Sequence, residues 1–468
     1  MVLKHTKNRC ITRQKLVSCV LSFFLIASPL AFFPSCASTQ VEEAPQLGVP
    51  EDFTKRELSN GIPVVFKQNR GSKIVVCKVV FEGGTSAIDA NLGGIEKLSL
   101  DLMLRGSEKY PYSKIQQVEY ENSVYLSDTS GKEFSTLGFM CIQRDMSLAL
   151  DMLSECIVNP SLSEGDFKQK MAEISSSIAN RKADPSGALG LAISKAVFNN
   201  HPYGTTATVT EESYKNINLP RVHGIHQSLV NALRMKIVVV GNFSFDLIES
   251  FTASLEEKFG SISKKAYSAP KIPKISINGS NVFVGNEQAG NTGYIAGLFE
   301  YPRRDSEECI PLAIAAMYID DLFFSQVREK AGATYSINIG ALGGQELLGV
   351  IEVFKATEKK QLKQLIFNAI SSFDEATIEK KLNQYKNRYI SSIFSSSQTA
   401  GGVASSIIAS MEYFNSETAY LKRPDLVEAV TSAQVIAAFK KYIEPVVKEN
   451  AIKWVVVDGE ENLGEYDF

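Results

Sequence analysis

One pattern occurs twice in this chain and limits the folds that it can adopt. The helix-like segment RVHGIHQSLVNAL leads into the apolar, β-branched run RMKIVVVGNF, and near the C-terminus SAQVIAAFKKYIEP leads into AIKWVVVDGE. Each apolar run is typical of a strand that is buried on both faces. The recurrence of a helix followed by such a strand indicates an internal repeat. We therefore predict two α/β domains of similar size, each a sheet covered by helices, joined as a clam shell.

The segment between the two halves has the composition of a linker. SISKKAYSAPKIPK contains two prolines and four lysines and has no apolar period. We predict an N-terminal domain over residues 53–260, a linker over 261–274 and a C-terminal domain over 275–468. Within the first domain, strands are expected at Pro63 to Lys67 and at Lys73 to Phe81.

The N-terminus has the layout of an export signal, because lysines and arginines precede an apolar run from Leu16 to Phe33. The run ends in FFPSC, and Cys36 with the small residues after it resembles a bacterial lipobox, in which the cysteine is lipidated. We predict a signal peptide over residues 1–36 and a polar tether over 37–52. An ordinary signal peptide cut nearby, or an uncleaved anchor, is the alternative. All three place the body outside the cytoplasm, in the bacterial cell envelope, and the lipobox interpretation also anchors it to the membrane through the lipid on Cys36.

Charge and cysteine content exclude or disfavour other classes. The formal net charge is -3, so no global field would attract nucleic acid. Outside the N-terminal segment the chain has the four cysteines Cys77, Cys141, Cys156 and Cys309. Their spacing matches no zinc motif and each lies in an apolar run, so buried free thiols are expected. Disulfides stay open as an alternative in an oxidising compartment.

The stretch GGIEKLSLDLMLRG, Gly93 to Gly106, is predicted to be a helix that begins at a glycine turn. Its apolar residues recur near the 3.6-residue period, so one face should be buried. The other face carries Glu96, Lys97 and Asp101 directly after strand-like runs. A helix in this position often carries chemistry, and this one raises the question of an active site or the remains of one.

Four segments together resemble the pitrilysin/insulinase family of zinc metallopeptidases, which includes processing peptidases. They are LSNGIPVVF, GGTSAIDANLGGIEKLSLDLMLRGSEKYP, VFNNHPYGTTATVTEESYKNI and LFFSQVREKAGATYSI, in the family's order and over the whole body. The resemblance implies the two-domain fold already expected. It also implies a helix with the inverted motif H-x-x-E-H, whose histidines bind zinc while the glutamate acts as general base.

Aligned through Met103 to Gly106, this chain has none of the family's metal-site residues. The two histidines correspond to Lys97 and Asp101, the general base to Leu100, and the third ligand to Ser177. A protonated lysine has no lone pair, and leucine and serine cannot replace these donors. We expect no metal, no cofactor and no catalytic residue in this chain. Lys97 and Asp101 are spaced to form an i, i+4 ion pair instead.

The histidines His201, His223 and His226 do not restore the site. His201 lies in the HPYG turn, and the other two are expected to be satisfied or solvent-facing residues on a helix.

The C-terminal half keeps a pair of residues that many family members use on the substrate. REKAGATYS contains Arg328 and Tyr335, which the resemblance implies bind the substrate peptide and polarise its carbonyl group. The structural alternative is that Arg328 is a solvated helix-end charge paired with Glu329, and that Tyr335 is an ordinary strand residue.

The chain lacks the family's metal-site residues but keeps Arg328 and Tyr335. This combination favours a division of labour between two subunits. Some family members work as heterodimers in which one subunit lacks zinc, and we predict that this chain is such a subunit, binding unfolded peptide beside a zinc-bearing paralogue. A peptide-binding pseudo-enzyme or envelope scaffold without proteolytic role is the alternative. An autonomous peptidase built around Asp101 and Glu173 is disfavoured, because no general base faces it.

Overall fold

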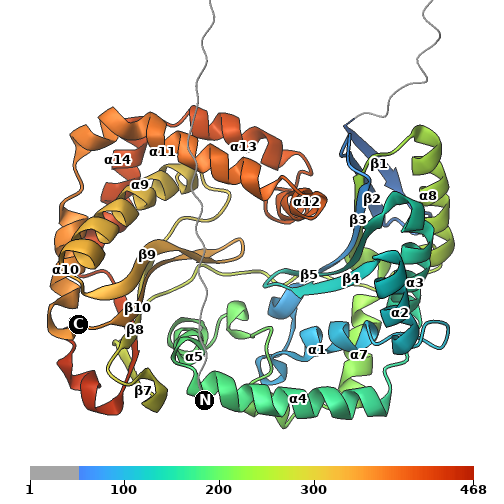
Figure 1. Cartoon of the computed structure of the whole chain (residues 1–468), viewed down its shortest axis with the longest axis horizontal. Coiled ribbons are helices and arrows are strands. Elements are labelled where there is room, and N and C mark those ends of the chain that lie inside the picture. Colours follow the sequence, from blue (N-terminus) through green and yellow to red (C-terminus); the bar gives the residue numbers. More distant parts are fainter. Residues whose placement is uncertain (1–51) are drawn as a thin grey trace, which may run out of the picture. The chain divides into compact units, whose positions relative to one another are not determined.

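The computed structural model describes residues 52–468. The predictions of a signal peptide, of lipidation at Cys36 and of a tether concern residues 1–52 and lie outside this part, Asp52 excepted. The first half of the described chain contributes the strands β1 (Phe53–Glu57), β2 (Pro63–Gln68), β3 (Ile74–Glu82), β4 (Tyr125–Ser130), β5 (Phe134–Ile142) and β6 (Met235–Gly241). They form a six-stranded sheet in the order β1-β2-β6-β3-β5-β4 (Figure 1).

The helices of the first half lie in the sequence between these strands and after the last of them. They are α1 (Ile95–Met103), α2 (Tyr112–Asn122), α3 (Met146–Val158), α4 (Glu164–Ala183), α5 (Pro185–Phe198), α6 (Glu211–Tyr214), α7 (Leu219–Leu229) and α8 (Phe245–Phe259). Residues 263–281, between α8 and β7, form no helix or strand.

A second sheet is built from β7 (Val282–Gly285), β8 (Gly293–Glu300), β9 (Thr334–Gly343), β10 (Leu347–Ala356) and β11 (Lys453–Asp458), in the order β7-β11-β8-β10-β9. Its helices are α9 (Cys309–Leu322), the π-helical segment η7 (Phe323–Lys330), α10 (Lys359–Ser371), α11 (Glu375–Ser396), α12 (Ala400–Phe414), α13 (Ala419–Glu428), α14 (Ser432–Ala438), the π-helical η8 (Phe439–Ile443) and α15 (Glu444–Lys448). Single 3-10 turns are η1 (Gly84–Ala87), η2 (Ala90–Leu92), η3 (Gln143–Asp145), η4 (Pro202–Gly204), η5 (Ala232–Arg234), η6 (Glu287–Ala289) and η9 (Glu460–Glu465).

The two strands that were predicted to be buried on both faces are β6 and β11. In β6, Ile237 and Val239 join the core under the helices of the first half, whereas Val238 and Val240 belong to a separate cluster on the opposite face. β11 alternates in the same way between two clusters of the second half. The consecutive apolar residues in the middle of these two strands are explained by burial on both faces.

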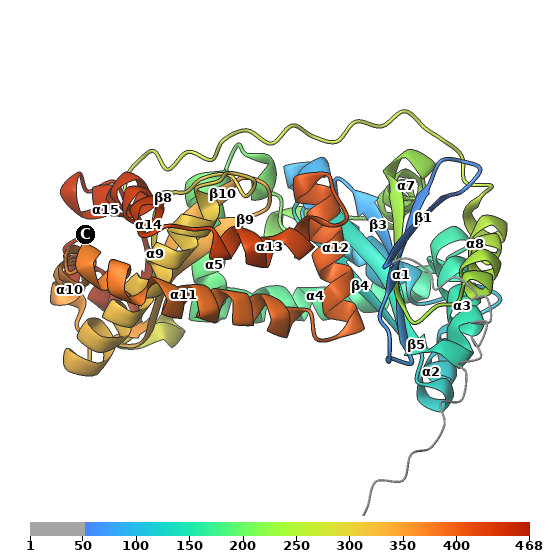
Figure 2. The same ribbon diagram turned by 90° about the horizontal axis from the view of Figure 1, so that it is seen from above.

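Each half covers the free face of the other half's sheet with one of its own helices. Ala188, Leu189 and Ile193 of α5 pack on the second sheet, against Leu298 of β8 and other residues of that face. Conversely, small and apolar residues of α12 pack on the first sheet, against Val238 and Val240 (Figure 2). This cross-packing joins the halves through two apolar interfaces, and local sequence patterns do not predict it.

The helical run Cys309–Lys330 is long and apolar enough to cross a membrane by length and composition alone. Leu312, Ile319 and Phe323 of this run lie in the core of the second half, together with β9 and β10. Packing of this kind accounts for its hydrophobicity, because core helices of large domains are apolar around most of their circumference.

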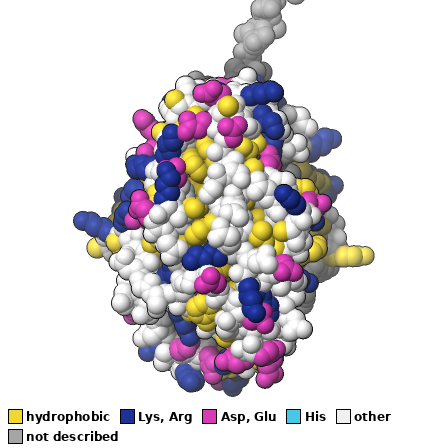
Figure 3. Space-filling view, turned by 90° about the vertical axis from the view of Figure 1, so that its left-hand side faces the viewer, with side chains coloured by type: hydrophobic (Ala, Val, Ile, Leu, Met, Phe, Trp, Pro, Cys, Tyr) yellow, Lys and Arg dark blue, Asp and Glu magenta, His cyan; other side chains and the backbone are white. Residues whose placement is uncertain are grey.

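The cysteines and the charge distribution agree with the sequence analysis. Cys77, Cys141, Cys156 and Cys309 are buried free thiols, as predicted. On the face at the left of Figure 1, lysine and arginine side chains alternate with aspartate and glutamate (Figure 3). This face therefore has no patch of a single charge sign that would attract nucleic acid.

Candidate functional site

The helix α1 begins at a glycine turn, as the sequence predicted. Gly94 adopts the left-handed conformation with φ of 84°, and its N–H donates to the carbonyl of Thr206 at 2.8 Å. A Cβ atom at this position would lie 2.2 Å from the backbone nitrogen of Val209. Only glycine fits here, so the turn fixes where the helix starts and which residues of α1 face the neighbouring strand β4.

Lys97 lies between two carboxylates. Its ammonium group donates to Asp101 one helical turn later, which confirms the predicted ion pair, and lies 3.0 Å from Oδ2 of Asp128 on β4. Burial lowers the pKa of Lys97, but the hydrogen bonds and charges of Asp101 and Asp128 outweigh it and raise the pKa overall. Lys97 therefore stays protonated and has no lone pair for a metal ion.

Sequence reasoning missed Asp128. It lies in a polar strand whose exposure alternates, and Lys97 reaches it only because β4 packs beside α1. Burial raises the pKa of Asp128, and the neighbouring Lys97 opposes that rise. A strand-to-helix contact of this kind leaves no signal in one sequence, because the two residues are far apart along the chain.

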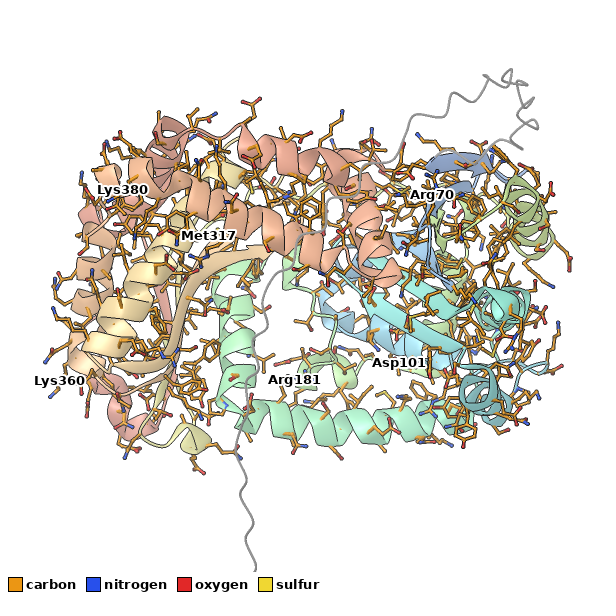
Figure 4. The ribbon with its side chains drawn as sticks, turned by 45° about the horizontal axis from the view of Figure 1, so that its top comes forward. Arg70, Asp101, Arg181, Met317, Lys360 and Lys380 are labelled. Atoms are coloured by element: carbon orange, nitrogen blue, oxygen red, sulfur yellow. The ribbon has the colours of Figure 1, made fainter. Side chains whose placement is uncertain are left out.

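The other metal-site positions hold no donor set for zinc. Leu100 is fully buried in the core of the first half. Ser177 on α4 accepts a hydrogen bond from Arg181 at 3.4 Å, and Glu173 one turn earlier lies 3.9 Å from Arg105 and 3.2 Å from Lys170. Figure 4 shows Asp101 on α1 and Arg181 on α4, the two helices that carry these positions.

A zinc ion does not fit these residues. Within residues 52–468, no three histidine, cysteine, aspartate or glutamate side chains are grouped so that they could hold a metal. Zinc prefers imidazole, thiolate and carboxylate donors, whereas α1 and α4 offer an ammonium group, a leucine and a hydroxyl group at the aligned positions.

Glu96 is a second acidic residue of α1 that the family motif does not explain. Its side chain is buried, and one carboxylate oxygen accepts hydrogen bonds from Ser135 and, at 3.4 Å, from Ser130. The other oxygen has no hydrogen-bond partner within the described chain. Burial raises the pKa of Glu96, which the serines and Arg234 only partly oppose.

Replacing Glu96 with glutamine should remove a pH-dependent destabilisation of the native state. A carboxyl group whose pKa is raised by folding binds its proton more tightly in the native state, so its ionisation lowers stability as the pH rises above about 4.3. The difference in unfolding free energy between Glu96→Gln and the wild type should therefore grow from pH 4 to pH 8, by about 1.4 kcal/mol for each unit of pKa shift. Denaturant titrations at several pH values measure this difference.

Asp151→Asn is the control, because the wild-type carboxylate should affect stability with the opposite pH dependence. Burial raises the pKa of Asp151, but hydrogen bonds from Lys109, Tyr110 and Lys258 outweigh it and bring the pKa to about 2. Its stabilising effect is present above the unfolded pKa of about 3.9 and is lost as the pH falls towards 2. If the difference in unfolding free energy between Glu96→Gln and the wild type does not change with pH, while that of Asp151→Asn changes as expected, then the pKa of Glu96 is not raised by folding and our assignment is wrong.

Arg328 and Tyr335 lie at the junction of η7 and β9. The guanidinium carbon of Arg328 is 5.8 Å from the ring centroid of Tyr335 and 5.1 Å from that of Phe324. Its nearest carboxylate is Glu329, at 3.8 Å, and the Tyr335 side chain is exposed, at 70% of its residue surface. The contacts of the described structure pair these two residues with each other but do not join them to α1 or α4.

The three histidines have separate roles. His201 accepts from the N–H of Tyr203 at 3.1 Å and contacts the carbonyl of Pro273 at 2.8 Å. His226 contacts the carbonyl of Ile157 at 2.8 Å, and burial lowers its pKa. His223 is exposed on α7.

Comparison with family models matches both halves of the chain. The model described as Insulinase (Peptidase family M16) matches residues 63–211, and the model described as Peptidase M16 inactive domain matches residues 216–389. Among curated relatives, an uncharacterized zinc protease of Mycobacterium leprae is 26% identical over 219 residues, which are 45% of this chain and 48% of that protein. One of Mycobacterium tuberculosis is 24% identical over 45% of this chain and 49% of that protein. The chain thus matches about half the length of these curated relatives.

Solved structures show the same architecture. A peptidase M16 inactive domain from Pseudomonas fluorescens has a TM-score of 0.75 at 17% identity, covering 87% of this chain and 98% of that one. A protease from Helicobacter pylori has a TM-score of 0.76 at 13% identity, covering 88% and 100%. The periplasmic protease PqqL of Escherichia coli has a TM-score of 0.73 at 14% identity, covering 94% and 49%. These likenesses confirm the predicted fold class of two sheets with their helices.

Proposed function

The chain belongs to the insulinase family, peptidase family M16, and from this premise we propose that it is a non-catalytic subunit of a two-chain zinc metallopeptidase. In this proposal the zinc is held by a paralogous partner that keeps the H-x-x-E-H motif. The present chain binds unfolded peptide and supplies Arg328 and Tyr335 to the shared site.

The observation that carries the proposal is the Lys97 ion-pair cluster. A protonated ammonium group lies beside Asp101 and Asp128, on the helix where the family places its metal ion. A protonated ammonium group at this place offers a divalent cation no ligand and occupies the two neighbouring carboxylates. These ion pairs stand at the aligned metal positions of α1, which supports a division of labour between two chains.

The geometry of Arg328 supports a role towards a second molecule. Among residues 52–468 its guanidinium group forms no ion pair other than the 3.8 Å contact with Glu329, and the exposed Tyr335 lies next to it. π-helical turns such as η7 occur frequently at functional sites. An arginine and a tyrosine in this position can both donate hydrogen bonds to a peptide carbonyl group as negative charge develops on it.

The edge of the first sheet supports binding of an extended peptide. β4 pairs with β5 alone, so its outer edge is not used by another strand of the sheet. Its residues are exposed or half-buried along the whole strand. An accessible edge of this kind can accept a peptide as an additional strand through backbone hydrogen bonds.

Location in the cell envelope is part of the proposal. The basic residues, the apolar run and Cys36 of the N-terminus have the order of a lipoprotein signal. PqqL, one of the similar solved structures, is a periplasmic protease. We propose that this chain is extracytoplasmic and lipid-anchored.

The test is reconstitution with a family member from the same genome that retains H-x-x-E-H. The pair should cleave a quenched fluorescent peptide, whereas this chain alone should not. Arg328→Ala should lower kcat/KM of the pair by about 100-fold or more, the effect of removing a donor that stabilises a developing oxyanion. Lys330→Ala, an exposed change in the same segment, is the matched control and should leave kcat/KM unchanged.

Two outcomes would contradict the proposal. If Arg328→Ala leaves the activity of the pair unchanged, the role assigned to Arg328 is wrong. If the chain binds peptide but forms an active pair with no zinc-bearing family member, it is a peptide-binding scaffold rather than a peptidase subunit.

A further inference from the structure

A cavity of about 550 Å³ lies in the second half, away from α1 and from Arg328. We call it the α12–α13 cavity, because residues of these two helices form much of its wall. The start of α9 and the end of α11 complete it. Its volume lies in the range of small-molecule and short-peptide sites.

Apolar and aromatic side chains form the body of the α12–α13 cavity. It is lined by Tyr413 and Phe414 of α12, by Tyr420 and Leu426 of α13 and by Ile310 of α9. Phe414 and Leu426 are exposed at 36% and 55% of their surfaces. Large apolar side chains left in contact with water at the rim of a cavity indicate a site that another molecule covers.

Two arginines in this cavity have no carboxylate partner within the described chain. Arg304 donates to the carbonyl oxygens of Gly344 and Gly343, at 2.7 and 3.4 Å, and its guanidinium carbon lies 4.8 Å from the ring centroid of Tyr413. Arg423 donates to the hydroxyl of Tyr389 at 2.6 Å. Neither takes part in an ion pair among residues 52–468, and each guanidinium group has N–H donors beyond these hydrogen bonds.

Both guanidinium groups belong to the lining of the α12–α13 cavity and act on the same buried neighbours. Burial raises the pKa of Cys309, and Arg423 and Arg304 both oppose this rise. The same two arginines oppose the rise that burial causes in the pKa of Tyr301. The two arginines therefore contribute positive charge to the lining of the cavity, beside its apolar wall.

Two acidic residues and a lysine also belong to the lining. Asp305 is held by Arg303, which donates to its two oxygens at 3.0 and 3.1 Å. Glu307 is exposed and forms no ion pair within the described chain. Lys422 adds a third exposed cation to the lining.

From this arrangement we infer that the α12–α13 cavity binds an apolar molecule carrying one free carboxylate, which Arg304 and Arg423 hold while the aromatic wall receives the apolar body. Guanidinium groups bind carboxylates through strong, charge-assisted hydrogen bonds. Ser397, Ser406 and Gln434 also line the cavity and can donate to a peptide group. Both the C-terminus of a peptide with an apolar last residue and a medium-chain fatty acid have this chemistry.

The experiment compares ligands that differ only in the carboxylate. Binding of N-acetyl-Leu-Phe, of its C-terminal amide and of decanoate to the purified protein is measured by isothermal titration calorimetry. The free acid should bind, and the amide should bind at least about tenfold more weakly. Arg423→Gln and Arg304→Gln should each reduce affinity for the acid, whereas Arg388→Gln, on α11 in an ion pair with Asp321, should not.

Ala409→Phe keeps both arginines but fills the cavity, and it should abolish binding even if an arginine variant folds poorly. Binding of the dipeptide acid alone identifies a peptide C-terminus as the ligand class, and binding of decanoate alone identifies a fatty acid. Equal affinity for acid and amide, unchanged binding by Arg423→Gln and Ala409→Phe, or no binding of any probe would overturn the inference. None of these results depends on whether a zinc-bearing partner exists.

Discussion

The wild-type protein should retain far less than one zinc per chain after equilibration with zinc and removal of the excess, whereas a triple variant should hold about one. The triple variant is Lys97→His, Asp101→His and Ser177→Glu. It restores two imidazoles one helical turn apart on α1 and a carboxylate on α4, and it removes the ammonium group that now lies between Asp101 and Asp128. Leu100 is left unchanged, because it is fully buried and a charge there would destabilise the core.

Zinc content is measured by inductively coupled plasma mass spectrometry after desalting. The matched control is the triple variant without Ser177→Glu, which should bind zinc much more weakly because it lacks the third ligand. About one tightly held zinc in the wild-type chain, lost on Asp101→Ala, would overturn the non-catalytic assignment. Failure of the triple variant to bind zinc would show that α1 and α4 no longer have the spacing of a metal site.

The largest loss of stability is expected from Asp458→Ala. Asp458 at the end of β11 is fully buried, lies 3.0 Å from Lys359, and accepts hydrogen bonds from Tyr466 and from the N–H of Gly459. Lys359 is also buried. Removing the carboxylate leaves a buried ammonium group without its counter-charge, which costs about 3–5 kcal/mol in comparable sites.

Urea titration monitored by circular dichroism measures this loss. Lys168→Ala, which breaks an exposed i, i+4 ion pair with Glu164, is the control and should change the midpoint little. A loss of less than about 1 kcal/mol for Asp458→Ala would mean that water reaches Lys359 and takes over the role of Asp458.

The sequence predicted what depends on local pattern. The β6 and β11 runs, the glycine turn before α1 and the Lys97–Asp101 pair follow from periodicity, from the conformational freedom of glycine and from i, i+4 spacing. These signals lie within a few residues of each other and need no knowledge of the tertiary structure. The role of Arg328 and Tyr335 stays a prediction, as do the N-terminal signal and the domain boundaries.

The sequence did not predict what depends on contacts between distant segments. Asp128 reaches Lys97 across the interface of β4 and α1, and Glu96 is buried because Ser135 of the neighbouring strand lies against it. The two arginines of the α12–α13 cavity are also far apart in the chain. Strand register and helix packing bring such pairs together, and neither is encoded by spacing along one sequence.

The cross-packing of α5 and α12 has a consequence for how the protein is made. A ribosome releases the first sheet complete once β6 has emerged, but the face around Val238 and Val240 stays in contact with water until α12 has been synthesised. During that interval the nascent chain exposes an apolar sheet surface, the kind of surface that chaperones bind and that aggregates. Secretion in an unfolded state, with folding only after the whole chain has crossed the membrane, would avoid this interval.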